Sequence, residues 1–129
     1  MPGVAAEVTV FGIPGCDQVR RARAWLRARG VPHAFHDVRA DGLPPQALAR
    51  WLRHLPWDAL LNRRGTTWRM LPAERKAAVV DQASAVEAIV AEPTLLKRPV
   101  VEAGSRLLVG FSEAAFESAF GAAADPEPV

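Results

Sequence analysis

The sequence predicts an α/β fold built on a mixed four-stranded sheet. Three observations lead to this class. An apolar, β-prone run near the start is followed by a Gly/Pro turn and an amphipathic helical pattern. The middle of the chain carries helical patterns, and two short apolar runs around a glycine near its end have the signature of a hairpin. The predicted order is β-α-β, a helical insertion, then β-β-α.

The first third of the chain predicts a β-α-β unit. Residues 7–12 are expected to form a buried strand, and residues 16–29 a helix that ends at Gly30. Residues 33–38 are expected to form the second strand. Because one helix connects the two strands, they should run parallel. The apolar stripe that faces the sheet from the helix is Val19, Ala22 and Leu26, with Trp25 beside it.

The insertion, at about residues 43–95, is predicted to be helical. Proline is favoured at the first turn of a helix, and a Ser-x-x-Glu sequence is typical of a capping box. The expected elements are a helix opened by Pro45, a short helical piece at 57–61, a loop at 62–69, a helix at 72–80, and a helix that starts with a capping box at 84–87 and ends before Pro93.

The last third predicts a hairpin and a helix. Residues 99–102 and 106–109 flank a short loop that contains Gly104. Ser112 is expected to cap a final helix that faces inward through Phe116, Ala119 and Phe120. This order of elements is the thioredoxin arrangement with helices added in its middle. We therefore expect a single thioredoxin-like domain at residues 7–120 and a flexible tail at 121–129.

Composition excludes several classes of protein. Half of the 129 residues are hydrophobic and 23% are charged, which is typical of a folded domain. The formal net charge of +2 is too small for a protein that coats nucleic acid. No apolar run approaches a membrane span of about 20 residues, and the first residues lack a secretory signal. We expect a cytoplasmic monomer that binds neither membrane nor nucleic acid.

The single cysteine is the strongest candidate for chemistry. Cys16 follows the turn Gly12-Ile13-Pro14-Gly15 and opens the first helix. Unpaired N–H groups and the helix dipole favour an anion at such a position, which lowers the pKa of a cysteine and favours the nucleophilic thiolate. With one cysteine the chain forms no internal disulfide. The alternative is a buried thiol that only fills space.

Motifs along most of the chain resemble a known group. The sequence is similar to the ArsC/Spx superfamily and most closely to the small bacterial YffB-type ArsC-like reductases. The motifs that carry the resemblance are Phe11-Gly12-Ile13-x-x-Cys16-Asp17, Phe35-His36-Asp37, Asp41-Gly42-Leu43, Leu60-Leu61-Asn62-x-Arg64-Gly65-Thr66-Thr67-Trp68-Arg69, Leu96-Lys97-Arg98-Pro99-Val100 and Val109-Gly110-Phe111-Ser112.

The resemblance implies a thioredoxin-like fold with its active cysteine at Cys16. It also implies that Arg98 contacts an oxyanion or the cysteine, and that Pro99 is the cis-proline facing the thiol. Two departures matter. True arsenate reductases of this type carry an arginine in the stretch that matches 109–111, and this chain has none. Spx-type regulators often have Cys-x-x-Cys, whereas the fourth position here is Val19.

Further candidates lie in the insertion and on the first helix. The arginine that arsenate reductases place in the insertion falls opposite Asn62, with Arg63 and Arg64 beside it. These residues and Thr66 either line the cleft or form a structural loop, and the sequence leaves open which arginine faces the thiol. Arg20, one turn into the helix, is a candidate cation for an anionic ligand. The three histidines lack metal-ligand spacing, so no metal or bound cofactor is expected.

These observations favour a thiol-dependent reductase. Cys16 would form a mixed disulfide or adduct with a small oxidised or anionic substrate. An external thiol must resolve it, and glutathione is the expected co-substrate because Arg98 and Arg64 suit its carboxylates. Two alternatives remain open. One is a non-catalytic Spx-like regulator that binds RNA polymerase, and the other is a true arsenate reductase.

Overall fold

The computed structural model describes residues 8–121, and its contacts divide the chain into two compact units. The sheet unit comprises residues up to 37 and from 98 onward, and the helical unit comprises residues 38–97. The predicted tail beyond Gly121 and the first residue of the predicted strand at 7–12 lie outside the described residues. A single domain over 7–120 stays a prediction.

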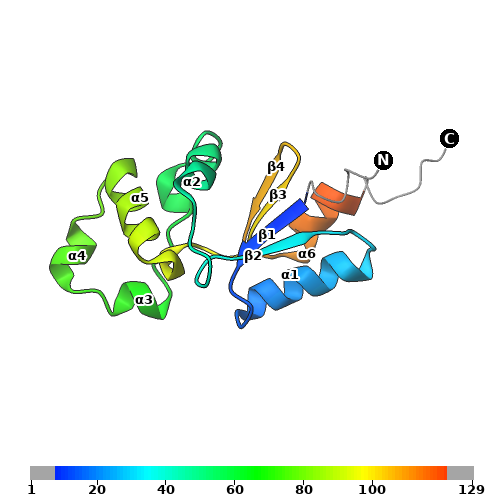
Figure 1. The fold of residues 1–129 in the computed structure, drawn as a ribbon, viewed down its shortest axis with the longest axis horizontal. Helices are drawn as coiled ribbons and strands as arrows, with labels where there is room; N and C mark the ends of the chain where they lie inside the picture. Colours follow the sequence, from blue (N-terminus) through cyan, green and yellow to red (C-terminus); the bar gives the residue numbers. More distant parts are fainter. Residues whose placement is uncertain (1–7, 122–129) are drawn as a thin grey trace. The chain divides into compact units, whose positions relative to one another are not determined.

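The sheet has four strands in the order β2-β1-β3-β4, as Figure 1 shows. They are β1 (Val8–Gly12), β2 (Ala34–Asp37), β3 (Val100–Ala103) and β4 (Arg106–Val109). β1 runs parallel to β2 and antiparallel to β3, and β3 and β4 form an antiparallel hairpin. The mixed four-stranded sheet is confirmed. The hairpin loop is one residue shorter than predicted, because Ala103 pairs with Arg106.

The first helix, α1 (Asp17–Ala28), ends as its sequence predicts. Gly30 has a φ of +69°, a left-handed conformation that glycine adopts without steric cost. Its N–H donates to the carbonyl of Arg27, and the N–H of Val31 donates to the carbonyl of Leu26. These paired bonds satisfy carbonyls that the helix end would leave unbonded. A sequence-local signal therefore places the C-terminal end of α1.

The helix α6 (Glu113–Phe116) and α1 pack on one face of the sheet. Ser112 caps α6, since its hydroxyl accepts from the N–H of Ala115 at 3.1 Å. A π-helical turn, Glu117–Gly121, continues the chain. Strand residues and both helices contribute to the core cluster, which consists of Val8, Val10, Ala22, Leu26, Val101, Phe116 and Phe120.

Gly12, at the end of β1, has no room for a side chain. A Cβ there would lie 2.5 Å from Cγ2 of the fully buried Val19. Valine is stiff at χ1, so it does not move aside cheaply. We expect Gly12→Ala to lower the free energy of unfolding by about 1–3 kcal/mol in urea denaturation. Gly15→Ala is the matched control, because its Cβ would meet nothing within 4 Å. An equal loss in both variants would contradict the steric explanation.

The helical unit contains four helices and two 3₁₀ turns. The helices are α2 (Pro45–Leu52), α3 (Thr66–Arg69), α4 (Ala73–Ala77) and α5 (Gln82–Ala91), and the turns are Trp57–Ala59 and Pro93–Leu95. An antiparallel bridge pairs Leu61 with Leu96. The largest fully buried side chains of this unit are Val38, Leu48, Trp51, Leu60, Leu61, Ile89, Leu95 and Leu96.

Some predictions for the insertion are wrong in detail. The stretch 62–69 is not all loop, because Thr66–Arg69 makes one helical turn that starts at Gly65. The capping box of α5 begins at Asp81 instead of Ser84: the Asp81 carboxylate accepts from the Ser84 N–H at 3.0 Å, and the Ser84 hydroxyl accepts from the Asp81 N–H at 3.1 Å. Serine suits either end of such a box, so sequence spacing alone chose the wrong one.

The helix predicted at 72–80 is shorter than its sequence pattern. It spans Ala73–Ala77, with Pro72 at its N-cap. The helix predicted over 16–29 and the piece at 57–61 appear as α1 and the 3₁₀ turn Trp57–Ala59. The sequence thus predicts most of the helices, whereas packing decides where the short helices of the insertion end.

Candidate functional site

Cys16 occupies the N-cap of α1. Its backbone is extended, with φ −74° and ψ 130°, and its side chain makes no capping hydrogen bond. The Cys16 N–H donates to the carbonyl of Ile13, and its own carbonyl accepts from the N–H of Arg20, both at 3.0 Å. The residue is half-buried and its thiol is free. The sequence prediction of a thiol at a helix start is therefore correct in position, and the thiol is not sealed in a core.

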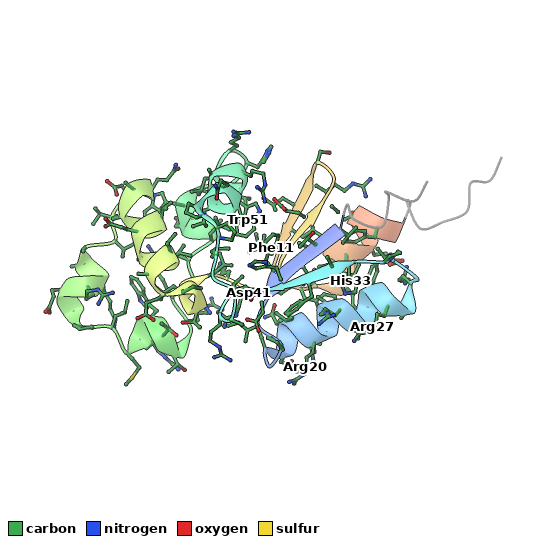
Figure 2. All side chains as sticks on the ribbon, viewed as in Figure 1. Phe11, Arg20, Arg27, His33, Asp41 and Trp51 are labelled. Carbon is green, nitrogen blue, oxygen red and sulfur yellow. The ribbon has the colours of Figure 1, made fainter. Side chains whose placement is uncertain are left out.

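Asp17, next to the thiol, has its charge opposed by two arginines. Its carboxylate oxygens lie 3.2 Å from Arg20 and 3.3 Å from Arg21. Arg20 also donates to the carbonyl of Gly15 at 3.2 Å. Arg20, a predicted ligand-binding residue, thus contacts the turn that precedes Cys16, on the exposed side of α1 (Figure 2). These exposed pairs offset the repulsion that Asp17 would exert on a thiolate.

The peptide bond between Arg98 and Pro99 is cis, as the resemblance implies. Val100 pairs with Phe11, so the cis bond lies at the end of the sheet from which β1 leads toward Cys16. Pro99 is buried, and its carbonyl accepts from the N–H of Gly110 at 2.8 Å. Arg98 is half-buried, with its Nε shielded from solvent. The sheet unit therefore gathers Cys16, Arg98 and Pro99 at one end of the sheet.

The four candidates of the insertion share one segment of the helical unit. The Asn62 side chain accepts from the N–H of Arg64 at 3.1 Å and lies against Gly65, where a Cβ would come within 2.7 Å of its amide nitrogen. Arg64 is exposed, and Thr66 is the first residue of α3. Asn62 therefore shapes this turn, which agrees with the interpretation of the segment as a structural loop.

Arg63 and Arg64 differ in their surroundings. The guanidinium of Arg63 lies 5.6 Å from the ring of Trp57 and 5.8 Å from that of Trp68. A guanidinium within about 6 Å of an aromatic face is attracted by the ring quadrupole. Arg63 thus lies within cation–π range of two indoles of its own unit, a contact that its sequence position did not reveal.

Sequence reasoning missed a cavity on the sheet unit. It is open to solvent and has a volume of about 620 Å³. Its aromatic wall is backed by the buried Phe116, which packs edge-on against Trp25 and Phe111. The signal was the pair of half-buried aromatics on α1 and just after β4. The residues that line the cavity are Arg21, Ala24, Trp25, Phe111, Ser112 and Glu113.

Over residues 8–121, no group of three or more His, Cys, Asp or Glu side chains is arranged to hold a metal ion. Within that same range, none of the helices combines the length and the apolarity that crossing a bilayer requires.

Arg23, one turn after Arg20 on α1, is half-buried. Its guanidinium lies 4.3 Å from the centre of the Phe35 ring, and its Nε donates to Nε2 of His33 at 3.3 Å. Burial, opposed by a hydrogen bond with the carbonyl of Val31 and assisted by the charges of Arg23 and Arg27, lowers the pKa of His33. The neutral imidazole is the form that accepts from Arg23.

This histidine predicts a pH dependence of stability. Because the pKa of His33 is lower in the folded state than the unfolded value of about 6.5, the unfolded chain binds more protons near that pH. We expect the free energy of unfolding to fall as pH decreases from about 7.5 through 6.5. In His33→Gln the slope over this window should be smaller, as measured by urea denaturation at each pH. His54→Gln, at an exposed position, is the control and should keep the wild-type slope.

Comparison with known proteins agrees with this geometry. The model of the ArsC family matches residues 11–119. The chain belongs to the ArsC family. An uncharacterized protein of Haemophilus influenzae is 38% identical over 113 residues, which cover 88% of this chain and 98% of that protein. The global transcriptional regulator Spx of Listeria innocua is 29% identical over 108 residues, which cover 82% of this chain and 81% of the regulator.

Solved structures agree with the family assignment. A YffB protein has a TM-score of 0.82 and 42% identity, covering 87% of this ArsC-family chain and 97% of its own. An arsenate reductase (ArsC) related protein of Brucella melitensis has a TM-score of 0.68 and 45% identity, covering 88% and 94%. The predicted resemblance and the thioredoxin-like fold are both confirmed.

Proposed function

We propose that this ArsC-family protein is a thiol-dependent reductase in which Cys16 is the nucleophile. The observation that carries the proposal is the half-buried, free thiol at the N-cap of α1, whose side chain makes no capping bond. The orphan N–H groups of the first turn and the helix dipole stabilise negative charge there. Structural buried cysteines lack this electropositive, accessible setting.

The proposed reaction needs one cysteine and an external thiol. The Cys16 thiolate attacks the sulfur of a mixed disulfide between a substrate thiol and glutathione. A bond forms between Sγ and the glutathione sulfur, the original S–S bond breaks, and the substrate leaves as a thiolate that takes up a proton. A second glutathione thiolate then attacks the Cys16 adduct, releasing glutathione disulfide and regenerating the Cys16 thiolate. The substrate sulfur is reduced to a thiol, one glutathione thiol is oxidised, and the glutathionyl group of the mixed disulfide becomes the other half of glutathione disulfide.

Glutathione is the proposed co-substrate for two reasons. The chain has no second cysteine to resolve the adduct. Arg98, half-buried at the same end of the sheet as the turn before Cys16, is a cation suited to a carboxylate of the tripeptide. Arg98 is also the residue that the family resemblance assigns to oxyanion or cysteine contact.

Adduct formation tests this chemistry directly. Incubation with glutathione disulfide should add one glutathionyl group to the intact protein, located at Cys16 by peptide mass spectrometry, and excess glutathione should remove it. Cys16→Ser is the control and should gain no mass. A wild-type thiol that stays unmodified under conditions that modify free cysteine would overturn the proposal.

A Spx-like regulatory role is the second candidate. It is favoured by the 29% identity to Listeria Spx across 81% of that regulator. In this alternative the protein binds the α-subunit of RNA polymerase without turnover. A local Cys-x-x-Cys switch does not operate, since the fourth position is the fully buried Val19. Capture of purified α-subunit equally by wild type and Cys16→Ser, without reductase activity in either, would favour this role.

Arsenate reduction is disfavoured. The stretch Val109-Gly110-Phe111 carries no arginine, so one cation of the oxyanion clamp expected for such enzymes is missing. A coupled assay with arsenate and glutathione decides this point. Turnover that depends on Cys16 would restore arsenate as the substrate.

A further inference from the structure

One side-chain hydrogen bond joins the start of α1 to a segment 93 residues away. The N–H of Phe111 donates to Oε1 of Gln18 at 3.0 Å. Gln18 is the second residue of α1 and lies two positions after Cys16. Gly110 is the first residue after β4, and Phe111 is the next. The bond therefore links the start of α1, where the thiol lies, to the residues that follow β4, at the end of the hairpin away from its loop.

The same segment also holds the cis-proline. The N–H of Gly110 donates to the carbonyl of Pro99 at 2.8 Å. Gly110 has a φ of +79°, and this left-handed turn lets two consecutive N–H groups serve two different partners. A Cβ at Gly110 would lie 3.7 Å from Oε1 of Gln18, so the glutamine oxygen passes close to this backbone. Residues 110 and 111 thus bridge Pro99 to the start of α1.

We infer that Gln18 is a positioning residue that sets the place of the Cys16 thiol relative to Pro99. Backbone pairing fixes β1 against β3, but the turn at 13–15 separates Cys16 from that ladder. The hydrogen bonds of Gly110 and Phe111 connect the start of α1 to Pro99, which the pairing of the strands does not do. Its catalytic consequence rests on the proposed function, because a nucleophile displaced by about 1 Å loses much of its rate.

The alternative is that the bond stabilises the fold and nothing more. The two roles differ in which measured quantities change when the bond is lost. Loss of the acceptor frees the Phe111 N–H in either case, so amide exchange at residue 111 reports that the bond is broken. Only a positioning bond also changes the reactivity of Cys16 while thermal stability is kept. The test therefore measures amide exchange at residue 111, alkylation of the thiol and turnover, each against thermal stability.

Gln18→Met is the test variant, since it keeps side-chain length and removes the acceptor. Gln46→Met is its matched control, because Gln46 is an exposed glutamine at the second position of α2. We expect amide exchange of Phe111 to accelerate about tenfold in Gln18→Met. Alkylation of Cys16 by iodoacetamide should slow about threefold to tenfold, and kcat should fall about tenfold with KM changed less than twofold. Gln46→Met should match wild type in each.

Gln18→Glu provides rescue of the bond, since a carboxylate oxygen also accepts from an N–H. Its Phe111 amide should exchange at the wild-type rate. Unchanged Phe111 exchange or unchanged Cys16 alkylation in Gln18→Met would overturn the inference, as would effects equal to those of Gln46→Met. A wild-type protein without turnover would count against the proposed reductase only, because exchange and alkylation test Gln18 without a substrate.

Discussion

Replacing Cys16 by serine is expected to abolish reductase turnover. The serine hydroxyl has nearly the size of the thiol, but it neither ionises near neutral pH nor forms a disulfide. The chain contains no other cysteine to take over. Removal of a nucleophile that acts as one unit with its surroundings typically costs several orders of magnitude in rate. We expect a loss of at least about a thousandfold in kcat/KM, measured with a glutathione mixed disulfide in an assay coupled to glutathione reductase.

The fold should survive this substitution. Cys16 is half-buried, its side chain makes no capping bond, and serine is a favoured N-cap residue. The free energy of unfolding should therefore stay within about 0.5 kcal/mol of wild type or rise slightly. Retained turnover in a folded Cys16→Ser protein would remove the nucleophile from the proposal. If the variant instead loses turnover because it unfolds, Cys16 has a structural role.

Phe116→Ala is expected to be the most destabilising single substitution in the sheet unit. Phe116 is fully buried, and its ring centre lies 4.8 Å from Phe111, 5.5 Å from Trp25 and 5.7 Å from Phe120. Truncating a buried phenylalanine removes its transfer free energy and leaves a cavity, at a cost of about 3–5 kcal/mol. Since domains are stable by about 5–15 kcal/mol, urea denaturation should show a midpoint far below that of wild type.

Two companion variants separate packing from other causes. Phe116→Leu keeps most of the apolar volume and should cost less than Phe116→Ala. Ser118→Ala changes an exposed residue of the same segment and should stay within about 0.5 kcal/mol of wild type. If Phe116→Ala and Ser118→Ala have equal stabilities, the aromatic cluster of Trp25, Phe111, Phe116 and Phe120 is not the core of this unit.

Much of the fold followed from sequence because its signals are local. Gly30 ends α1 with a left-handed turn, and Ser112 caps α6 through its own hydroxyl. Such signals involve groups within a few residues of each other. Some errors fall where two local interpretations compete, as at Asp81 and Ser84, where either residue suits a capping box. Others fall where packing decides the end of a short helix, as at Ala77.

The order of strands and helices, and a cysteine at the start of the first helix, were determined by the chain's own pattern. Periodicity and turn chemistry report on residues close in sequence, and these features need nothing more. Only the tertiary structure decided that the Arg63 guanidinium lies near two indole rings, that Arg23 contacts His33, and that the Gln18 side chain accepts a hydrogen bond from the Phe111 N–H. These partners come from different elements, the last pair 93 residues apart, so packing chooses them and no local pattern encodes the choice.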